Sequence, residues 1–369
     1  MVTKQKTILI VAGGTGGHVM PALAVAEYFI EQGIAVHWLG TKQGIEYKVV
    51  NKKNIPISYL HISGLRGKGI LQKLLGPIKI AIACFEAARI LIRVKPNMVL
   101  TMGGYVSGPA GLAAWMLRFP LVIHEQNAIA GWTNKILSRF AKKVLLAYPD
   151  TLEHANHKAV VTGNPLRKDF TQISVQSSIQ HMVQKSEEPA KSLKIHILVL
   201  GGSLGAQKLN QMLPATLCLL DNPAEYEIQH QTGDKHLDST MALYEQQGIK
   251  AKLTTFVEDM VSAYLWADIV ICRAGALTVA EVAQLGKACI FVPYPYAVDD
   301  HQKFNAKYLS DQGGALLIPE NKLTPQTLLE ALLTLSDPNR RNQMAEIAKN
   351  LAKPMATVKV ANECLTVAL

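Results

Sequence analysis

Four glycine-rich turns constrain the fold of this chain most strongly, since each follows an apolar run and precedes a stretch with helical character. They lie at residues 13–18 (GGTGGH), 103–108 (GGYVSG), 201–205 (GGSLG) and 274–278 (AGALT). A strand that turns through glycines into a helix leaves unpaired backbone N–H groups and the positive end of the helix dipole at one point, which suits a phosphate. Two such turns in each half predict two nucleotide-binding domains that face each other across a cleft.

Positive charge is concentrated in the first half of the chain. The whole sequence has a net charge of +10, but residues 1–165 hold 19 Lys and Arg against 7 Asp and Glu, and the remainder is slightly acidic. This asymmetry predicts an anionic partner for the first half, either nucleic acid or an anionic membrane surface. A length of 369 residues with 49% hydrophobic residues favours two domains with sizeable cores.

Cysteine usage and hydropathy indicate a cytosolic chain. The five cysteines are scattered through apolar segments without a Cys-x-x-Cys pair, which predicts buried, reduced thiols. The apolar run at residues 7–12 is too short for a secretory signal and fits a first strand. No apolar run reaches the roughly 18 residues that a spanning helix needs, so any contact with a membrane is expected to be peripheral.

Strand-like and helix-like segments alternate along both halves. The expected strands lie at residues 7–12, 35–39, 97–101, 120–123, 143–146 and 159–161, and then at 195–200, 226–230, 251–256, 268–272, 288–292 and 315–318. This alternation predicts an α/β fold of parallel sheets with helices on both faces and ligands at the carboxyl ends of the strands. A first helix is expected from Pro21 to Gln32, closed by Gly33.

The pattern restarts after residues 163–165 (GNP). We therefore expect a first domain at 1–165 and a second at 166–344, with a C-terminal helix at about 345–369 packing back on the first. Residues 171–194 are polar and lack apolar periodicity, which predicts a solvated connector.

Two common nucleotide motifs are absent from the sequence. The first turn lacks the last glycine of the dinucleotide fingerprint G-x-G-x-x-G, and the second expected strand ends without a carboxylate for a ribose. A G-x-x-x-x-G-K-[ST] phosphate loop is also absent. The sequence therefore excludes a dinucleotide enzyme and a P-loop kinase or ATPase at the level of motifs.

Several short motifs together resemble one family. They lie at 13–18, 103–109 (GGYVSGP), 124–127 (HEQN), 163–165 with Arg167, 201–206 (GGSLGA), 273–278 (RAGALT) with Glu281, and 299–302 (DDHQ) with Asn305 and Ala306. In order and spacing, from about residue 7 to the end, they resemble the MurG family of bacterial N-acetylglucosaminyltransferases, glycosyltransferase family 28. The resemblance implies a GT-B fold, two Rossmann-like domains with parallel sheets facing a central cleft, with the acceptor half first and the UDP-GlcNAc half second.

The resemblance also implies a reaction. GlcNAc would pass from UDP-GlcNAc to the C4 hydroxyl of the MurNAc of lipid I, undecaprenyl-diphospho-MurNAc-pentapeptide, to give lipid II. A single in-line displacement at the anomeric carbon would invert α to β without a covalent intermediate. This step belongs to peptidoglycan synthesis, and so to cell-wall biogenesis, cell shape and cell division.

Glu281 has two interpretations. Alone, the pattern Thr278-x-x-Glu281 fits a capping box at a helix start. The resemblance instead implies that this carboxylate accepts both ribose hydroxyls of UDP. It also implies contacts from Ser203 to the diphosphate, from Gln302 to the sugar hydroxyls and from the Val257 backbone to uracil. The rest of the implied donor site follows the fourth turn: Ala276, Leu277, Thr278, Val279 and Ala280.

Two residues are candidates for the general base. His18 ends the first glycine turn at a helix start, where the dipole favours a neutral imidazole that can accept the proton of the attacking hydroxyl. A lone histidine is otherwise more often structural. Glu125 is the alternative base, and the sequence does not separate the two.

Phosphate contacts are expected around these two residues. Thr15, Gly16, Gly17 and Asn127 would contact donor or acceptor phosphates. Arg167 would neutralise phosphate or bridge the closed cleft, or else is an exposed linker residue. No Asp-x-Asp motif presents a metal site, and the resemblance places the carboxylates of 299–300 near sugar hydroxyls. Neither a cofactor nor a metal is therefore expected, and fixed N–H and hydroxyl donors would stabilise the charge on the leaving UDP.

Residues 64–95 combine positive charge with large apolar side chains. The cationic residues are Arg66, Lys68, Lys73, Lys79, Arg89, Arg93 and Lys95, against Glu86, and the apolar ones are Ile70, Leu71, Leu74, Leu75, Ile78, Ile82 and Phe85. This pattern suits a helix in an anionic lipid interface, although an amphipathic helix packed on a sheet shares it. Trp115, Met116 and Arg118 would extend the patch.

We therefore expect a peripheral enzyme on the cytoplasmic face of the bacterial inner membrane. Its expected partners are UDP-GlcNAc, lipid I, the anionic membrane surface and proteins of the cell-wall and division machinery. The nearest alternatives are other GT-B lipid glycosyltransferases, which transfer galactose or glucose, and the UDP-GlcNAc 2-epimerases. A nucleic-acid-binding protein would explain the basic half, but it leaves the second pair of turns without a role and lacks aromatic-basic interleaving, so no nucleic acid is expected.

Overall fold

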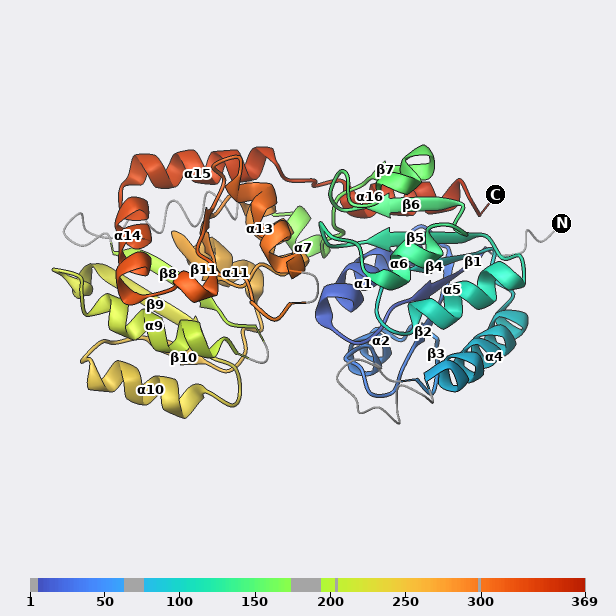
Figure 1. The fold of residues 1–369 in the computed structure, drawn as a ribbon, viewed down its shortest axis with the longest axis horizontal. Helices are drawn as coiled ribbons and strands as arrows, with labels where there is room; N and C mark the ends of the chain where they lie inside the picture. Colours follow the sequence, from blue (N-terminus) through green and yellow to red (C-terminus); the bar gives the residue numbers. More distant parts are fainter. Residues whose placement is uncertain (1–5, 63–75, 174–193, 203–204, 298–299, 369) are drawn as a thin grey trace. The chain divides into compact units, whose positions relative to one another are not determined.

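The computed structural model describes residues 6–62, 76–173, 194–202, 205–297 and 300–368, which form two compact units (Figure 1). The first unit contains Met1–Arg167 and Lys353–Leu369, and the second contains Lys168–Ala352. Most of the expected connector at 171–194 (residues 174–193) and the first part of the basic segment at 64–95 (residues 64–75) lie outside the described residues, whereas Thr171 ends a short helix. No described helix is long and apolar enough to cross a membrane.

The first unit is built on a seven-stranded parallel sheet in the order β3-β2-β1-β4-β5-β6-β7. Its strands are β1 (Thr7–Val11), β2 (Ala35–Gly40), β3 (Ile57–Tyr59), β4 (Met98–Thr101), β5 (Leu121–Glu125), β6 (Lys143–Leu146) and β7 (Ala159–Val161). Its helices are α1 (Gly16–Glu31), α2 (Glu46–Lys52), α4 (Gly76–Val94), α5 (Ser107–Met116), α6 (Trp132–Leu137), the 3₁₀ helix η1 (Glu153–Lys158) and α16 (Ala356–Leu365).

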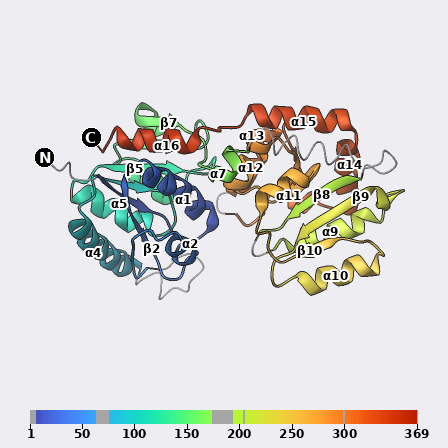
Figure 2. The same cartoon turned by 180° about the vertical axis from the view of Figure 1, so that it is seen from behind.

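The run TILIV of β1 is apolar throughout because both faces of the sheet are covered. Successive side chains of a strand point to opposite faces. Ile8 and Ile10 accordingly join the core under α1 and α16, whereas Leu9 and Val11 join the core under α4, α5 and α6 (Figure 2).

The second unit has a six-stranded parallel sheet in the order β10-β9-β8-β11-β12-β13. Its strands are β8 (Ile195–Leu200), β9 (Tyr226–Gln231), β10 (Lys252–Thr254), β11 (Ile269–Cys272), β12 (Ala288–Phe291) and β13 (Leu316–Leu317). Its helices are α7 (Lys168–Thr171), α9 (Gln207–Leu217), η2 (Pro223–Glu225), α10 (Leu237–Gln246), α11 (Met260–Trp266), α12 (Ala276–Leu285), α13 (His301–Ser310), η4 (Glu320–Lys322), α14 (Pro325–Ser336) and α15 (Pro338–Asn350). The prediction of two α/β domains with parallel sheets is confirmed.

The C-terminal helix α16 belongs to the first unit, although more than half of the chain separates it from the other elements there. Val360, Ala361 and Cys364 are fully buried in the same core as Ile8 (Figure 1). The expected returning segment began at about residue 345, which falls inside α15. That helix packs on α12, α14 and β12 and belongs to the second unit, so the chain changes unit at Lys353 instead.

Three local expectations were wrong. Of the five cysteines expected to be buried, Cys218 is exposed and Cys84 is half-buried. The first helix begins at Gly16, so Pro21 lies inside it rather than at its start. The missing N–H of Pro21 leaves the carbonyl of Gly17 without its helical bond, and the exposure of Gly17 allows water to take that place. β3 was missed because it has only three residues directly after a proline.

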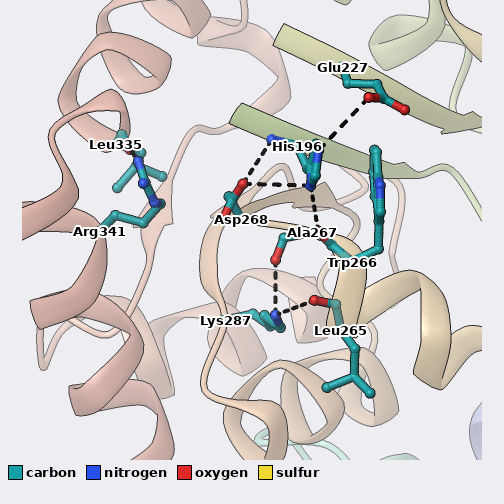
Figure 3. A network of polar contacts seen from close by, with 9 residues as sticks. All are labelled: His196, Glu227, Leu265, Trp266, Ala267, Asp268, Lys287, Leu335 and Arg341. Carbon is teal, nitrogen blue, oxygen red and sulfur yellow. Dashed lines mark hydrogen bonds and ion pairs between the residues drawn. The ribbon is translucent and has the colours of Figure 1, made fainter. Parts of the chain in front are cut away.

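At the amino ends of the second sheet, polar side chains tie loops to strands (Figure 3). The His196 ring stacks on Trp266 at 4.6 Å, and its backbone N–H donates to Asp268 Oδ2 at 2.9 Å. Lys287 Nζ donates to the Leu265 and Ala267 carbonyls at the end of α11, and Arg341 similarly closes α14 through Leu335. Cations at helix carboxyl ends satisfy orphan carbonyls, so this network stabilises the frame.

Candidate functional site

The four glycine turns lie at the two topological switch points of the sheets. In the first unit the turns follow β1 and β4, which are neighbours, with β2 and β5 extending the sheet in opposite directions. In the second unit they follow β8 and β11, which are likewise neighbours. The crevice at such a point, beyond the carboxyl ends of the strands, is where open α/β sheets bind ligands. The turns thus mark one candidate edge in each unit.

The two turns of the first unit pack against each other. Gly103 and Gly104 have positive φ values of 96° and 82°. A Cβ at Gly104 would overlap the carbonyl oxygen of Gly13, and a Cβ at Gly103 would overlap the ring of His18. These two glycines therefore permit close packing between the turns, a role that the sequence analysis had assigned to phosphate contact.

A buried carboxylate that the sequence analysis missed holds the first turn. Glu46 is fully buried, and its Oε2 accepts from the Gly14 N–H at 3.1 Å. Its Oε1 accepts from the N–H and the hydroxyl of Thr41, both at 2.8 Å. Thr41 Oγ1 in turn lies 3.1 Å from the hydroxyl of Tyr105 in the second turn. A glutamate at the start of a short helix is common on surfaces, so the sequence offered no signal for this contact.

His18 is half-buried on the first turn of α1, two residues after the helix begins. Its Nδ1 lies 3.0 Å from Gln126 Oε1. Gln126 follows β5 and is almost fully buried, as is His124 before it. Thr15, Gly16 and Gly17 surround the start of α1, and Thr15 and Gly17 are exposed. No described side chain caps this helix start, so its first amides remain available to an acceptor from outside.

The Glu125 carboxylate accepts four hydrogen bonds from the segment that follows β5. Its Oε1 accepts from the backbone N–H and Nδ2 of Asn127 at 3.0 and 3.2 Å. Its Oε2 accepts from the Gly131 N–H at 3.1 Å and from Asn134 Nδ2 at 2.8 Å. The side chain is only 2% exposed. A carboxylate with four donors is well suited to holding the segment between β5 and α6, and poorly suited to taking a proton from a substrate.

In the second unit, the turn after β8 is shaped by its glycines. Gly202 has φ +77°, and a Cβ there would meet no atom of the described residues within 4 Å. Gly205 has the same φ, and a Cβ there would overlap the carbonyl oxygen of Thr232. Among the described residues, the space beside the Cα of Gly202 is therefore open. Ser203 lies outside the described residues.

The turn after β11 leads into α12, whose N-cap is Gly275 and not Thr278. Thr278 lies within the helix and no described side chain caps its start, so the capping-box interpretation of Glu281 is wrong. The first-turn amides of Ala276, Leu277 and Thr278 have no partner within the helix. The Val279 N–H donates to the Gly275 carbonyl at 2.9 Å, and the next residue, Ala280, is half-buried.

Glu281 lies in the next turn of α12 and is 7% exposed. The hydroxyl of Tyr264 donates to its Oε2 at 3.2 Å. Burial and the adjacent carboxylate raise the pKa of Tyr264 well above its usual range, so this hydroxyl stays protonated and keeps donating. Tyr264 therefore orients the Glu281 carboxylate. Like Glu46, Tyr264 is a residue of the site that no sequence motif indicated.

Two residues of α13 support the same edge. Gln302 Oε1 accepts from the Tyr294 N–H at 2.9 Å, which ties α13 to the loop after β12. The buried Asn305 donates through Nδ2 to the Ala274 carbonyl at 3.3 Å, which ties α13 to the turn after β11. Asp300 is the N-cap of α13, with φ +53°, and Asp299 lies outside the described residues.

The other predicted positions lie at strand ends or near a unit boundary. Val257 is half-buried and follows β10 by three residues, and its neighbour Phe256 is 61% exposed. An exposed aromatic ring at a ligand-binding edge can stack on a base, and its signal in the sequence is one aromatic residue after a strand. Arg167 is half-buried at the end of the first segment of its unit, so it is not an exposed linker residue.

Comparison with known proteins identifies the family. The glycosyltransferase family 28 N-terminal domain matches residues 8–146, and the family 28 C-terminal domain matches residues 196–360. The chain belongs to glycosyltransferase family 28. The resemblance found in the sequence is thereby confirmed, and both glycine-turn edges lie within the matched domains of the family 28 chain.

Relatives of the family 28 chain match it along almost its full length. A protein of Marinobacter nauticus, named UDP-N-acetylglucosamine–N-acetylmuramyl-(pentapeptide) pyrophosphoryl-undecaprenol N-acetylglucosamine transferase, is 46% identical over 365 residues, covering 99% of this chain and 98% of the relative. The crystal structure of Acinetobacter baumannii MurG is 42% identical, with a TM-score of 0.79 and coverage of 97% and 98%. A UDP-GlcNAc 2-epimerase from Neisseria meningitidis bound to UDP-GlcNAc reaches 0.67 at 17% identity, with coverage of 98% and 100%, and shares the fold alone.

Proposed function

We propose that this family 28 enzyme transfers GlcNAc from UDP-GlcNAc to the C4 hydroxyl of the MurNAc of undecaprenyl-diphospho-MurNAc-pentapeptide, giving lipid II. The observation that carries the proposal is the 46% identity, over 99% of the chain, to a transferase named for these substrates. The ligand-binding edges of the two sheets agree with this proposal. The edge of the second unit suits a nucleotide sugar, and the edge of the first unit carries His18 at the start of α1, which no described side chain caps.

The donor is proposed to bind at the carboxyl edge of the second sheet. The free amides at the start of α12, from Ala276 to Thr278, suit the diphosphate, and the open turn at Gly202 lets it approach the backbone. Glu281, oriented by Tyr264, is an acceptor for the ribose hydroxyls. The uracil would meet the Val257 backbone and stack on Phe256, and Gln302 would reach the sugar hydroxyls. Ser203 and Arg167 remain proposed phosphate contacts.

His18 is proposed as the general base. Its half-buried imidazole lies at the start of α1, where no described side chain caps the helix. The Glu125 carboxylate, in contrast, accepts four hydrogen bonds that fix the loop containing Asn127. In the proposed step, the C4 hydroxyl attacks the anomeric carbon as its proton moves to His18. The bond to the UDP oxygen breaks with inversion, and N–H donors stabilise the charge on the departing diphosphate.

The first unit is proposed to meet the lipid-borne acceptor on the cytoplasmic face of the inner membrane. The start of α4 exposes Ile78, Ile82 and Phe85 at 58%, 52% and 65%, with Lys79 and Arg89 exposed beside them. α5 packs along α4, and at its end Trp115 and Met116 are 47% and 66% exposed. Apolar side chains flanked by cations fit an anionic lipid interface better than water.

The test is a transfer assay with the purified full chain, labelled UDP-GlcNAc and lipid I. We expect labelled lipid II with a β linkage from UDP-GlcNAc and little product from UDP-galactose. Conversion of UDP-GlcNAc into its 2-epimer without acceptor would instead establish an epimerase and refute the proposal.

Variants separate the assigned roles in that assay. His18→Ala is expected to lower kcat by about 10²-fold or more, as for loss of a general base, with little change in KM for UDP-GlcNAc. Glu125→Gln is expected to lower activity together with stability, since it removes an acceptor for two loop donors. Near-normal turnover of His18→Ala would refute its role as base.

A further inference from the structure

A line of hydrogen bonds runs from the interior of the first sheet to His18, and it begins at the carbonyl oxygen of Gly163. This oxygen lies 3.1 Å from His124 Nε2. Because a carbonyl only accepts, Nε2 must carry a hydrogen. Burial lowers the pKa of His124 to about 4, so the ring is neutral near pH 7 and has one N–H only. Its Nδ1 therefore presents a lone pair.

Gln126 is held in one orientation by two acceptors on the same side. Its Nε2 lies 3.0 Å from the lone pair of His124 Nδ1 and 2.9 Å from the carbonyl oxygen of Met102. A flipped amide would place Oε1 against both of these acceptors and leave no donor among the three groups. Nε2 is therefore the group that faces inward, and Oε1 is the group that faces His18.

The orientation of Gln126 determines which nitrogen of His18 carries the hydrogen. Oε1 of an amide only accepts, and it lies 3.0 Å from His18 Nδ1. Nδ1 must then donate, so the neutral imidazole has its lone pair at Nε2. Within the described part of the chain, Nε2 has no hydrogen-bond partner.

We propose that Gln126, fixed by His124, is a positioning residue that holds His18 as the Nδ1–H tautomer and so presents Nε2 as the proton acceptor for the attacking hydroxyl. This inference rests on the proposed function, in which His18 is the base. Without an acceptor at Nδ1, the half-buried ring exchanges between both tautomers, and part of the population has no lone pair at Nε2.

The surroundings make this arrangement rigid. The backbone carbonyl of Gln126 accepts from the buried Nδ2 of Asn164 at 3.1 Å, which fixes the main chain at this point. The backbone of Gly103 also lies so close to the His18 ring that a Cβ on this glycine would overlap Nδ1. A base held within a narrow range of positions loses less free energy of ordering when the substrate binds.

The test compares wild type with Gln126→Met, which keeps the side-chain length and removes both polar groups. The full chain is labelled with ¹⁵N-histidine, and a His18→Gln sample identifies the His18 signals. Two-bond ¹H–¹⁵N correlations without substrate report the tautomer. We expect wild-type His18 as the Nδ1–H form and Gln126→Met as a mixture with a large Nε2–H fraction. In the transfer assay, kcat of the variant should fall at least in proportion to the lost Nδ1–H fraction, with KM for UDP-GlcNAc within twofold.

Thr101→Val is the matched control. Thr101 is fully buried next to Met102, and its hydroxyl has no hydrogen-bond partner among the described residues. This change therefore removes a polar group at the same depth without touching the line of hydrogen bonds, and both the His18 tautomer and kcat should stay as in wild type.

The outcomes distinguish the inference from the proposed function. An Nδ1–H His18 in Gln126→Met, or an Nε2–H His18 in wild type, overturns the inference whatever the activity. A changed tautomer with unchanged kcat supports the positioning by Gln126 and overturns the role of His18 as base. A changed tautomer with reduced kcat supports both.

Discussion

Replacing Glu46 by glutamine is expected to destabilise the first unit by removing one charge-assisted hydrogen bond. The carboxylate accepts from Gly14 through one oxygen and twice from Thr41 through the other, and it is fully buried. An amide can keep its oxygen toward Thr41, where two donors point, and then presents NH₂ to the Gly14 N–H. The Gly14 N–H and the new NH₂ group then face each other as two donors without an acceptor in a partly buried place, which costs about 1.5–3 kcal/mol.

Hydrogen exchange measures this loss in the unit concerned. Since about 1.4 kcal/mol corresponds to a factor of ten, amides of β1 and β2 that exchange through global unfolding of the unit should exchange roughly 10- to 150-fold faster in Glu46→Gln. Peptides from β8 and β11 in the second unit should exchange as in wild type. Exchange is preferable to one unfolding curve because a chain with two units need not unfold in two states.

Glu27→Gln is the matched control for this measurement. Glu27 lies on α1 in the same unit and pairs with Lys53 at 2.7 Å, with side chains 25% and 52% exposed. Such a surface pair contributes about 0–1 kcal/mol, so exchange should change by at most a few-fold. If Glu46→Gln changed exchange no more than Glu27→Gln, the buried carboxylate would not be holding the turn, and the reasoning would be refuted.

Three further predictions follow from single contacts. Phe256→Ala should weaken UDP-GlcNAc binding by about 1–3 kcal/mol in calorimetry, the usual contribution of base stacking, and unchanged affinity would remove Phe256 from the site. In native protein, iodoacetamide should modify the exposed Cys218 first, because burial raises the pKa values of Cys289 and Cys364; early labelling of either buried thiol would contradict their burial. Burial lowers the pKa of His230 to about 3 against about 6.5 when unfolded, so only the unfolded chain takes up its proton as pH falls between these values. The second unit should therefore lose about 2 kcal/mol from pH 7 to pH 5 through this group, and in His230→Phe that part of the pH dependence should disappear; an unchanged slope would be the contrary result.

The order of strands and turns could be predicted from the sequence for two reasons. Strands covered on both faces are uniformly apolar, and a glycine-rich turn is recognised from a few consecutive residues. All twelve expected strands are present, and the turns after β1, β4, β8 and β11 lie where expected. β3 was missed because three residues do not form a recognisable pattern.

The site could be predicted only in part, since its organisation depends on contacts between distant segments. No local pattern shows that Gly104 meets Gly13, or that Glu46 reaches the Gly14 amide across 32 residues. The capping-box pattern at Thr278 misled because the helix already starts at Ala276, after a glycine N-cap. The inferred tautomer of His18 likewise depends on the backbone carbonyl groups of Met102 and Gly163. No sequence pattern shows which backbone carbonyl faces a given side chain.

The return of α16 to the first unit has a consequence for biosynthesis. Val360, Ala361, Cys364 and Ala368 fill the same core as residues of β1, the first strand of the chain. During translation, the amino-terminal half emerges long before these side chains exist, so the face of its sheet that α1 and α16 share is covered by α1 alone while the whole second unit is made. The second unit, whose segment is continuous, can complete its own core first, contrary to the usual order in which the domain nearest the amino terminus folds ahead.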